Sequence, residues 1–232
     1  DDSAGALIQQ DGNDLYIWNK ENSFFSFGTN ASEQMRLDSS GHLLIGTTTE
    51  GHPSGDDLTV ATTANTGITI RSGTSNFGAI FFSDGTSGAD EYRGYIEYDH
   101  SSNYMRFGTN AAQRMRIDSD GRLLLGLTSA RGNFYHNSSG VETKFHVEGT
   151  TFTTSSAAFT RNSNNASDAE LILAKSRGGS IGENTIVQDE DSLGAISFQG
   201  ADGSEMIEAA AITTYVNGSP GSNDMPGELV FS

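Results

Sequence analysis

The chain has 232 residues, no Cys, a net charge of −17 and a pI near 4.4. The absence of Cys excludes disulfides, thiolate metal sites and Cys nucleophiles. With 13 basic against 30 acidic residues, nucleic acid and anionic membranes are poor partners, since both reward clustered Lys and Arg. No apolar run approaches the roughly 18 residues of a membrane span, so we expect no membrane insertion.

Leu, Ile, Val and Phe together supply about a fifth of the residues. This proportion, with the high net charge, lies at the border of intrinsic disorder. Regular alternation along the chain favours folding instead, into short strands whose apolar face is completed by neighbouring chains. The sequence opens on Asp1-Asp2, and we recognise no signal peptide there.

In chain order, one strand type starts three times with Gly-Ala followed by apolar residues, and an Asp-Gly turn follows each start. In the first two copies an aromatic strand, a polar turn and a second aromatic strand come next. We therefore predict strands at residues 5–8, 15–18, 24–27, 78–81, 95–98, 104–107 and 194–197.

A hairpin at residues 35–46 recurs 80 positions later at 115–126, preceded both times by Gly-Thr-Asn-Ala. Its Asp-Ser-x-Gly turn suits a hairpin, because Asp bonds to the backbone two residues on and Gly tolerates positive φ. Alternation predicts that Met115 and Ile117 are buried and that Arg116 lies in water. The repeat-hairpin residues are Met35, Leu37, Asp38, Gly41, Leu43, Ile45, Met115, Ile117, Asp118, Gly121, Leu123 and Leu125.

The later copies contain two further expected strands. Residues 58–60 match 145–147, and residues 68–72 match 171–176. The stretch 169–175 contains helix formers, but we predict a strand because its counterpart is β-branched and Gly178-Gly179 would stop a helix.

These repeats predict an all-β fold, an elongated repetitive array of short strands and hairpins. We expect three modules: residues 1–50, a partial repeat ending in a hairpin; 51–130, a complete repeat; and 131–232, a third repeat with a loop inserted at 180–192 and truncated before its hairpin. A lone hairpin is marginal in water. A closed homo-oligomer would bury the apolar faces and cover the strand edges.

No constellation in the sequence predicts a catalytic or metal site. Asp118-Ser119-Asp120-Gly121 resembles the start of a calcium loop, but no bidentate Glu follows and Ser40 replaces Asp120 in the first copy, so a hairpin turn is favoured. The five His are dispersed without metal-ligand spacing. Asp189-Glu190-Asp191 is interpreted as the tip of the inserted loop.

Aromatic residues also occur outside the strands. In the connector 131–137 they could stack on sugar, but packing of a module joint is favoured. Trp18 is predicted to belong to the core. Asn30, Asn137, Asn165 and Asn217 match the glycosylation pattern, which chance explains in a chain so rich in Asn and Ser.

The segment YIEYDHSSNYMRFGTNAAQR, followed by MRIDSDGRLLLG, resembles repeat modules of tail fibre proteins from tailed bacteriophages, and the third copy resembles another module of these proteins. The resemblance implies a homotrimeric β-fibre, a β-prism or triple β-helix-like shaft, on the virion. It also implies a C-terminal chaperone domain beyond this array. Expected partners are the chain itself, other virion tail proteins and a host surface glycan.

We therefore expect a non-enzymatic, cofactor-free shaft segment that contributes to host-cell attachment. Two alternatives remain open. One is a tailspike that degrades polysaccharide, which would need paired carboxylates at a defined separation. The other is a bacterial extracellular adhesin or filament.

Overall fold

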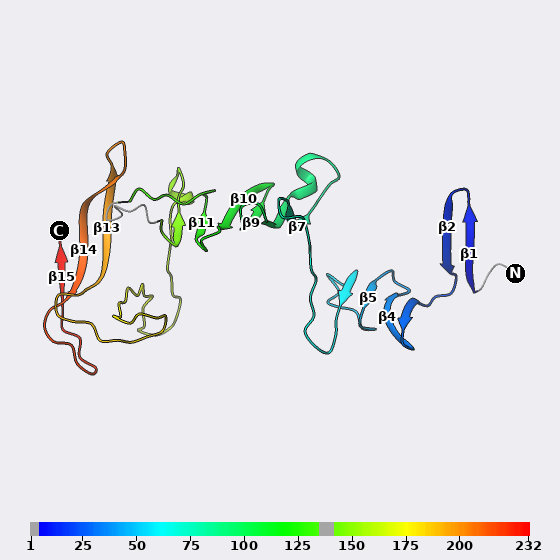
Figure 1. Cartoon of the computed structure of the whole chain (residues 1–232), viewed down its shortest axis with the longest axis horizontal. Coiled ribbons are helices and arrows are strands. Elements are labelled where there is room, and N and C mark those ends of the chain that lie inside the picture. Colours follow the sequence, from blue (N-terminus) through cyan, green and yellow to red (C-terminus); the bar gives the residue numbers. More distant parts are fainter. Residues whose placement is uncertain (1–4, 135–141) are drawn as a thin grey trace. The chain divides into compact units, whose positions relative to one another are not determined.

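The computed structural model describes residues 5–134 and 142–232 (Figure 1). Over these residues it consists of strands, two short 3-10 helices and connecting segments, so the all-β prediction is confirmed. The chain divides into two compact units, Asp1–Ile70 (unit 1) and Arg71–Ser232 (unit 2).

Unit 1 contains two sheets. One is a hairpin of β1 (Ala6–Asp11) and β2 (Asp14–Asn19). The other has four strands in sequence order, antiparallel except for the parallel pair β5 and β6. Its strands are β3 (Phe25–Thr29), β4 (Ser32–Leu37), β5 (Leu43–Ile45) and β6 (Leu58–Val60).

Unit 2 contains a six-stranded sheet, in the order β12-β11-β10-β9-β8-β7, and a three-stranded sheet, β13-β14-β15. The first comprises β7 (Phe77–Phe82), β8 (Gly94–Asp99), β9 (Tyr104–Thr109), β10 (Ala112–Ile117), β11 (Leu123–Leu125) and β12 (Phe145–Val147). The second comprises β13 (Ser192–Ala201), β14 (Met206–Val216) and β15 (Gly227–Phe231). The 3-10 helices are η1 (Gly88–Tyr92) and η2 (Phe152–Thr154).

Each repeated sheet contains a hairpin with a two-residue Asn-Ala turn. The β3–β4 and β9–β10 hairpins turn through Asn-Ala pairs, at Asn30-Ala31 and Asn110-Ala111, with φ between 52° and 56°. Positive φ at both central residues matches the twist of the flanking strands, which is why such two-residue turns are favoured in hairpins. Ala rarely adopts this conformation. For this reason the repeated Gly-Thr-Asn-Ala segment did not predict a turn.

The two copies of the repeat pair their strands differently. In unit 2, β8 joins β9, whereas in unit 1 the equivalent β2 and β3 belong to separate sheets. The β8–β9 pair carries a salt bridge of 2.6 Å between the directly opposed Arg106 and Glu97, and Glu97 is buried. Tyr95 is also buried and packs against Gly108, its directly paired neighbour. The first copy has Ile and Ser, residues 17 and 26, in place of the ion pair.

Each repeated sheet draws its last strand from the sequence that follows the hairpin. β6 pairs with β5 across the module boundary expected at residue 50, and β12 pairs with β11 across the boundary expected at residue 130. The matched positions of residues 58–60 and 145–147 in the sequence correspond to these strands.

Two predicted strands are wrong. Residues 68–72 and 171–176 are neither strand nor helix, because no neighbouring strand supplies a hydrogen-bonding ladder. Leu173 nevertheless packs closely on Gly194 of β13, where an added Cβ would lie 2.8 Å from its side chain. Apolar alternation alone therefore did not distinguish a paired strand from an unpaired extended segment.

The chain buries little of its apolar surface. The buried apolar residues of the described structure are Leu44, Tyr95, Leu124, Val187, Ala211 and Val216. The accessible surface is 17178 Å², whereas a compact monomer of 24.6 kDa exposes roughly 10,000 Å². Most of the large apolar side chains therefore remain in contact with solvent in the single chain.

Asp191 is the buried polar anchor of the segment before β13. Its carboxylate accepts hydrogen bonds of 2.6 and 2.8 Å from the Arg177 guanidinium and one of 2.9 Å from the backbone of Gln188, and Lys175 lies 3.4 Å away. The prediction of a loop tip is therefore wrong for Asp191, whereas Asp189 and Glu190 do form an exposed turn. Of these two, Asp189 accepts a hydrogen bond from the backbone N–H of Gly218.

We predict that Gly108→Ala destabilises unit 2 by about 1–3 kcal/mol, the usual cost of overpacking. The new Cβ would lie 2.1 Å from the Tyr95 ring, which is buried. Urea unfolding followed by circular dichroism measures the change. Gly200→Ala is the matched control, because its Cβ meets nothing within 4 Å, and an equal loss there would refute the packing argument.

We predict an acid-sensitive contribution from Asp191. Hydrogen bonds from Arg177 and from the Gln188 backbone hold the pKa of Asp191 far below its ordinary value. A lowered pKa in the folded state stabilises the protein above the unfolded-state pKa of about 3.9, and this contribution is lost as the pH falls below that value. Asp191→Asn should lower the thermal midpoint at pH 7 and flatten its fall between pH 5 and 2. Exposed Asp168→Asn should keep the wild-type profile; identical profiles for both variants would contradict this.

Candidate functional site: an unpartnered apolar sheet face

The strand register of unit 2 places twelve residues on one side of the six-stranded sheet, because directly paired residues project to the same side. We call this side the apolar face. One row across it is Ile80, Ile96, Phe107, Met115, Leu125 and Val147. The next row is Gly78, Tyr98, Met105, Ile117, Leu123 and Phe145.

Nothing in the described chain covers the apolar face. All twelve of its residues are half-buried or exposed. Ile80 is 49% exposed and Phe145 is 57% exposed, at opposite edges of the sheet. A soluble monomer rarely leaves so continuous an apolar surface in water, so such a surface marks an interaction site.

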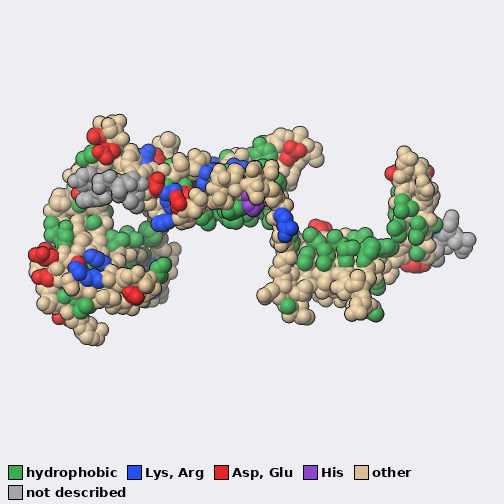
Figure 2. All heavy atoms as spheres, viewed as in Figure 1, with side chains coloured by type: hydrophobic (Ala, Val, Ile, Leu, Met, Phe, Trp, Pro, Cys, Tyr) green, Lys and Arg blue, Asp and Glu red, His purple; other side chains and the backbone are tan. Residues whose placement is uncertain are grey.

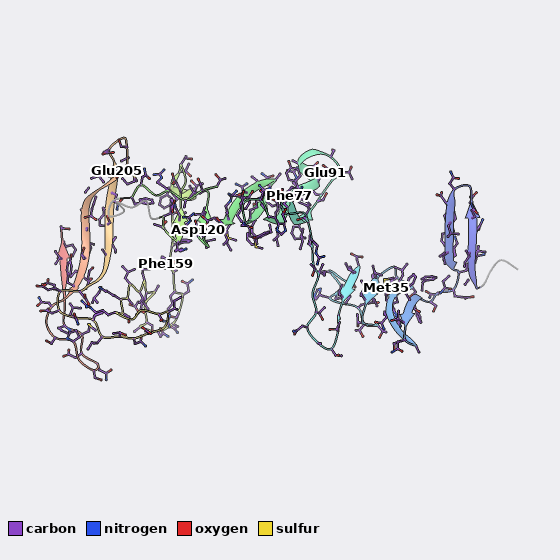
Figure 3. All side chains as sticks on the ribbon, viewed as in Figure 1. Met35, Phe77, Glu91, Asp120, Phe159 and Glu205 are labelled. Carbon is purple, nitrogen blue, oxygen red and sulfur yellow. The ribbon has the colours of Figure 1, made fainter. Side chains whose placement is uncertain are left out.

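Unit 1 repeats this arrangement on its four-stranded sheet. Figure 2 shows the hydrophobic side chains of this sheet gathered in one band over β4 and β5, and Met35 on β4 is labelled in Figure 3. Leu37 and Leu58 are each about half exposed. The equivalent face of unit 1 is formed by Phe25, Phe27, Met35, Leu37, Leu43, Ile45, Leu58 and Val60.

The opposite side of the six-stranded sheet is covered within the chain at β10 and β11, whereas Phe77 and Phe81 at its β7 edge are about half exposed. On β11, Leu124 is fully buried beside Arg116, its directly paired neighbour. The Arg116 guanidinium lies 3.8 Å from the Tyr104 ring centroid and donates to the Thr128 carbonyl at 2.7 Å. The prediction that Arg116 lies in water is therefore wrong. Ile117, predicted to be buried, is 40% exposed in the single chain.

The repeat-hairpin residues frame the apolar face at its turns. Asp38 accepts backbone hydrogen bonds from Ser40 and His42, and Asp118 accepts them from Asp120 and Arg122, all at 2.9–3.0 Å. The glycines at the turn exits, residues 41 and 121, have φ of 94° and 70°. Asx chemistry at the entry and a positive φ at the exit therefore fix both hairpins, as the turn sequence predicts.

Arg122 binds the carboxylates around the second turn. Its guanidinium binds Asp118 at 2.7 Å, Asp120 at 2.7 Å and Glu142 at 2.5 Å, and Asp120 lies at the tip of the turn (Figure 3). Burial alone would raise the pKa of Asp118, but its hydrogen bonds from Arg122 outweigh this and lower the pKa. Arg122 thus occupies the position where the sequence suggested a calcium loop.

The first turn gathers ligands that sequence spacing missed. Oxygen atoms of Asp38 and Glu50 and a ring nitrogen of His42 lie within 4.8 Å of one another, and His42 forms a second such group with Asp56 and Asp57. Burial alone would lower the pKa of His42. The surrounding carboxylates have the larger, opposite effect, so the pKa is raised overall. The missed signal was the turn, which brings residues i and i+4 together.

The other residues singled out in the sequence lie apart from the apolar face and from the two hairpin turns. Trp18, predicted to be in the core, is 53% exposed and stacks on Tyr16 with ring centroids 6.1 Å apart, because β1 and β2 have no further strand or layer beside them. Phe134 packs edge-on against His146, at 5.5 Å between centroids. The rest of the aromatic connector and Asn137 lie outside the described residues.

Compared with models of known protein families and with curated protein sequences, the chain matches none. The described residues also contain no helix long and apolar enough to span a membrane. The geometry is therefore the basis for assigning a function. Its most extensive feature is an apolar surface, repeated in both units, that is suited to association.

We predict that Ile117→Asp abolishes self-association and leaves the fold of the single chain intact. The new carboxylate would be buried without a partner in an assembled face, whereas in the free chain residue 117 is 40% exposed. Sedimentation velocity should show a shift to monomer, with an unchanged circular dichroism spectrum.

The matched control for this variant is Ile181→Asp, the same substitution on a fully exposed segment outside the sheets. It should leave the assembly intact. If both variants assemble equally well, the apolar face is not the contact surface.

Proposed function

We propose that this chain is a non-enzymatic shaft segment of a bacteriophage tail fibre, in which three copies bury their apolar faces against one another. The observation that supports this most directly is the repeated apolar face of both units. A second copy is the occupant that fits it best, because the same face recurs in each repeat and identical chains side by side would present these faces in register. The resemblance of residues 95–126 to fibre modules supports the same conclusion.

The exposed area supports a large obligate interface. The chain exposes roughly 7,000 Å² more than a compact monomer of its mass would. Obligate oligomer interfaces bury about 2,000–5,000 Å² or more in total and are rich in apolar residues. Since each partner contributes about half of that total, contacts of one chain with two others would remove about 2,000–5,000 Å² or more of this surplus.

Acidic loops complement the apolar face in this assembly. The carboxylates of Asp38, Asp118 and Asp120 gather at turns, beyond the strand ends. High net charge keeps such a protein soluble and disfavours random association. The fibre would act mechanically, as a rigid spacer on the virion that joins other tail proteins to a contact with a host surface glycan.

One observation favours a polysaccharide-degrading tailspike as the second candidate. A cavity of about 340 Å³ beside β14 is lined by Tyr215 and Asn217 together with Asp189, Glu190 and Glu228. Glycoside hydrolysis uses a pair of carboxylates. Asn217 donates a hydrogen bond of 2.8 Å to Glu228, and Gly218 donates one of 2.6 Å to Asp189, so both acids already hold structural partners.

Two measurements test the proposal. Sedimentation equilibrium of the purified chain at micromolar concentration should give a trimer; a folded monomer would refute the assembly. Gold-labelled antibody against the chain should mark fibres on virions in electron micrographs, and label on bacterial filaments would support an adhesin instead. Release of reducing sugar from capsular polysaccharide, lost in Glu190→Gln, would establish the tailspike alternative.

A further inference from the structure

The His42 turn of unit 1 holds a group of side chains that goes beyond the proposed function. His42 Nδ1 lies 3.1 Å from Asp38 Oδ2 and 3.4 Å from Glu50 Oε1. Asp38 and His42 come from the β4–β5 turn, and Glu50 comes from the connector before β6. Asp38 and His42 are less than a fifth exposed, whereas Glu50 is half exposed, so the cluster opens to solvent on the Glu50 side.

The second copy of the repeat shows what this position requires. Arg122, the counterpart of His42 80 residues on, binds three carboxylates at 2.5–2.7 Å. Lys144, which donates to the carbonyl of Asp120, stands at the position of Asp57, since the backbone carbonyl of each accepts a hydrogen bond from the first residue of the preceding strand, β11 or β5. The position is thus built to hold cationic charge among carboxylates.

The first copy has more negative charge and less positive charge. Asp38, Glu50, Asp56 and Asp57 surround a His that carries at most one positive charge, where the second copy sets Arg122 and Lys144 against three carboxylates. Two observations therefore coincide: ligand atoms gathered within 4.8 Å, and a cation at the equivalent place in the repeat.

The ligand set selects the class of ion. Tetrahedral Zn²⁺ binds imidazole nitrogen and carboxylate oxygen at about 2.0–2.2 Å, so its neighbouring ligand atoms lie roughly 3.3 Å apart. The two observed separations, 3.1 and 3.4 Å, bracket this value. Ca²⁺ and Mg²⁺ prefer oxygen ligands throughout and gain little from an imidazole.

We propose that Asp38, His42 and Glu50 bind a divalent transition-metal ion of the Zn²⁺ class, which ties the connector at residues 47–57 to the β4–β5 turn. The ion takes the place that the Arg122 guanidinium fills in the second copy. It is a structural site at the boundary between two repeats.

The test uses Zn²⁺ itself as the probe on the full chain at pH 7.5. Isothermal titration calorimetry should show one ion bound per chain at micromolar affinity, and Zn²⁺ should raise the thermal midpoint, whereas Ca²⁺ and Mg²⁺ should not. Glu50→Gln removes a half-exposed ligand without disturbing the fold, and should weaken binding by about tenfold or more, since even outer-shell changes at metal sites cost that much.

His42→Arg is the decisive control, because it installs the residue of the second copy. This variant should lose the Zn²⁺ response and keep a thermal midpoint at or above that of the metal-free wild type. Unchanged Zn²⁺ affinity in His42→Arg or in Glu50→Gln would place the ion elsewhere and overturn the proposal, as would the absence of binding at 100 μM Zn²⁺.

Discussion

The structure depends on one constraint: the strands of each repeat form a sheet whose apolar side has no cover within its own chain. Sheets are stable when one face packs on something else, and here connectors such as the one that carries Thr128 cover only the opposite side. The uncovered side is also the more apolar one, with Phe107, Met115 and Leu125 in a single row. The single chain therefore leaves this side in contact with solvent, and the proposed association would cover it.

The two copies of the repeat differ at a few residues and also in how their strands pair. The six-stranded sheet of unit 2 joins β8 to β9 through a directly opposed Glu97–Arg106 pair, reinforced by Tyr95 against Gly108. Cross-strand pairs of this kind stabilise a sheet by a few tenths to about 1 kcal/mol each. The first copy lacks the Glu97–Arg106 pair, and its equivalent strands β2 and β3 lie in separate sheets.

The sequence predicted the elements better than their surroundings. Strand positions and the Asp-Ser-x-Gly turns follow from local chemistry, and the structure has the predicted hairpins. The sequence could not show which side of the sheet is covered. Arg116 alternates with apolar residues, as a solvent-facing residue would, but it lies over Tyr104 and donates to Thr128 of a connector whose position no periodicity predicts. The cluster around His42 was missed for a similar reason: Asp56 reaches it only because β6 pairs in parallel with β5.

The boundaries of the sequence repeats do not coincide with the boundaries of the sheets. β6 and β12 come from the sequence after each hairpin, yet each completes the sheet before it. Extending the chain at either joint must therefore break the hydrogen bonds of the parallel pair, such as Leu123 N–H to the Lys144 carbonyl at 2.8 Å. The same joint carries the Arg122–Glu142 ion pair in the second copy and the His42–Glu50 contact in the first. Charge at this position thus reinforces the point where one repeat is tied to the next, as the proposed fibre shaft would require.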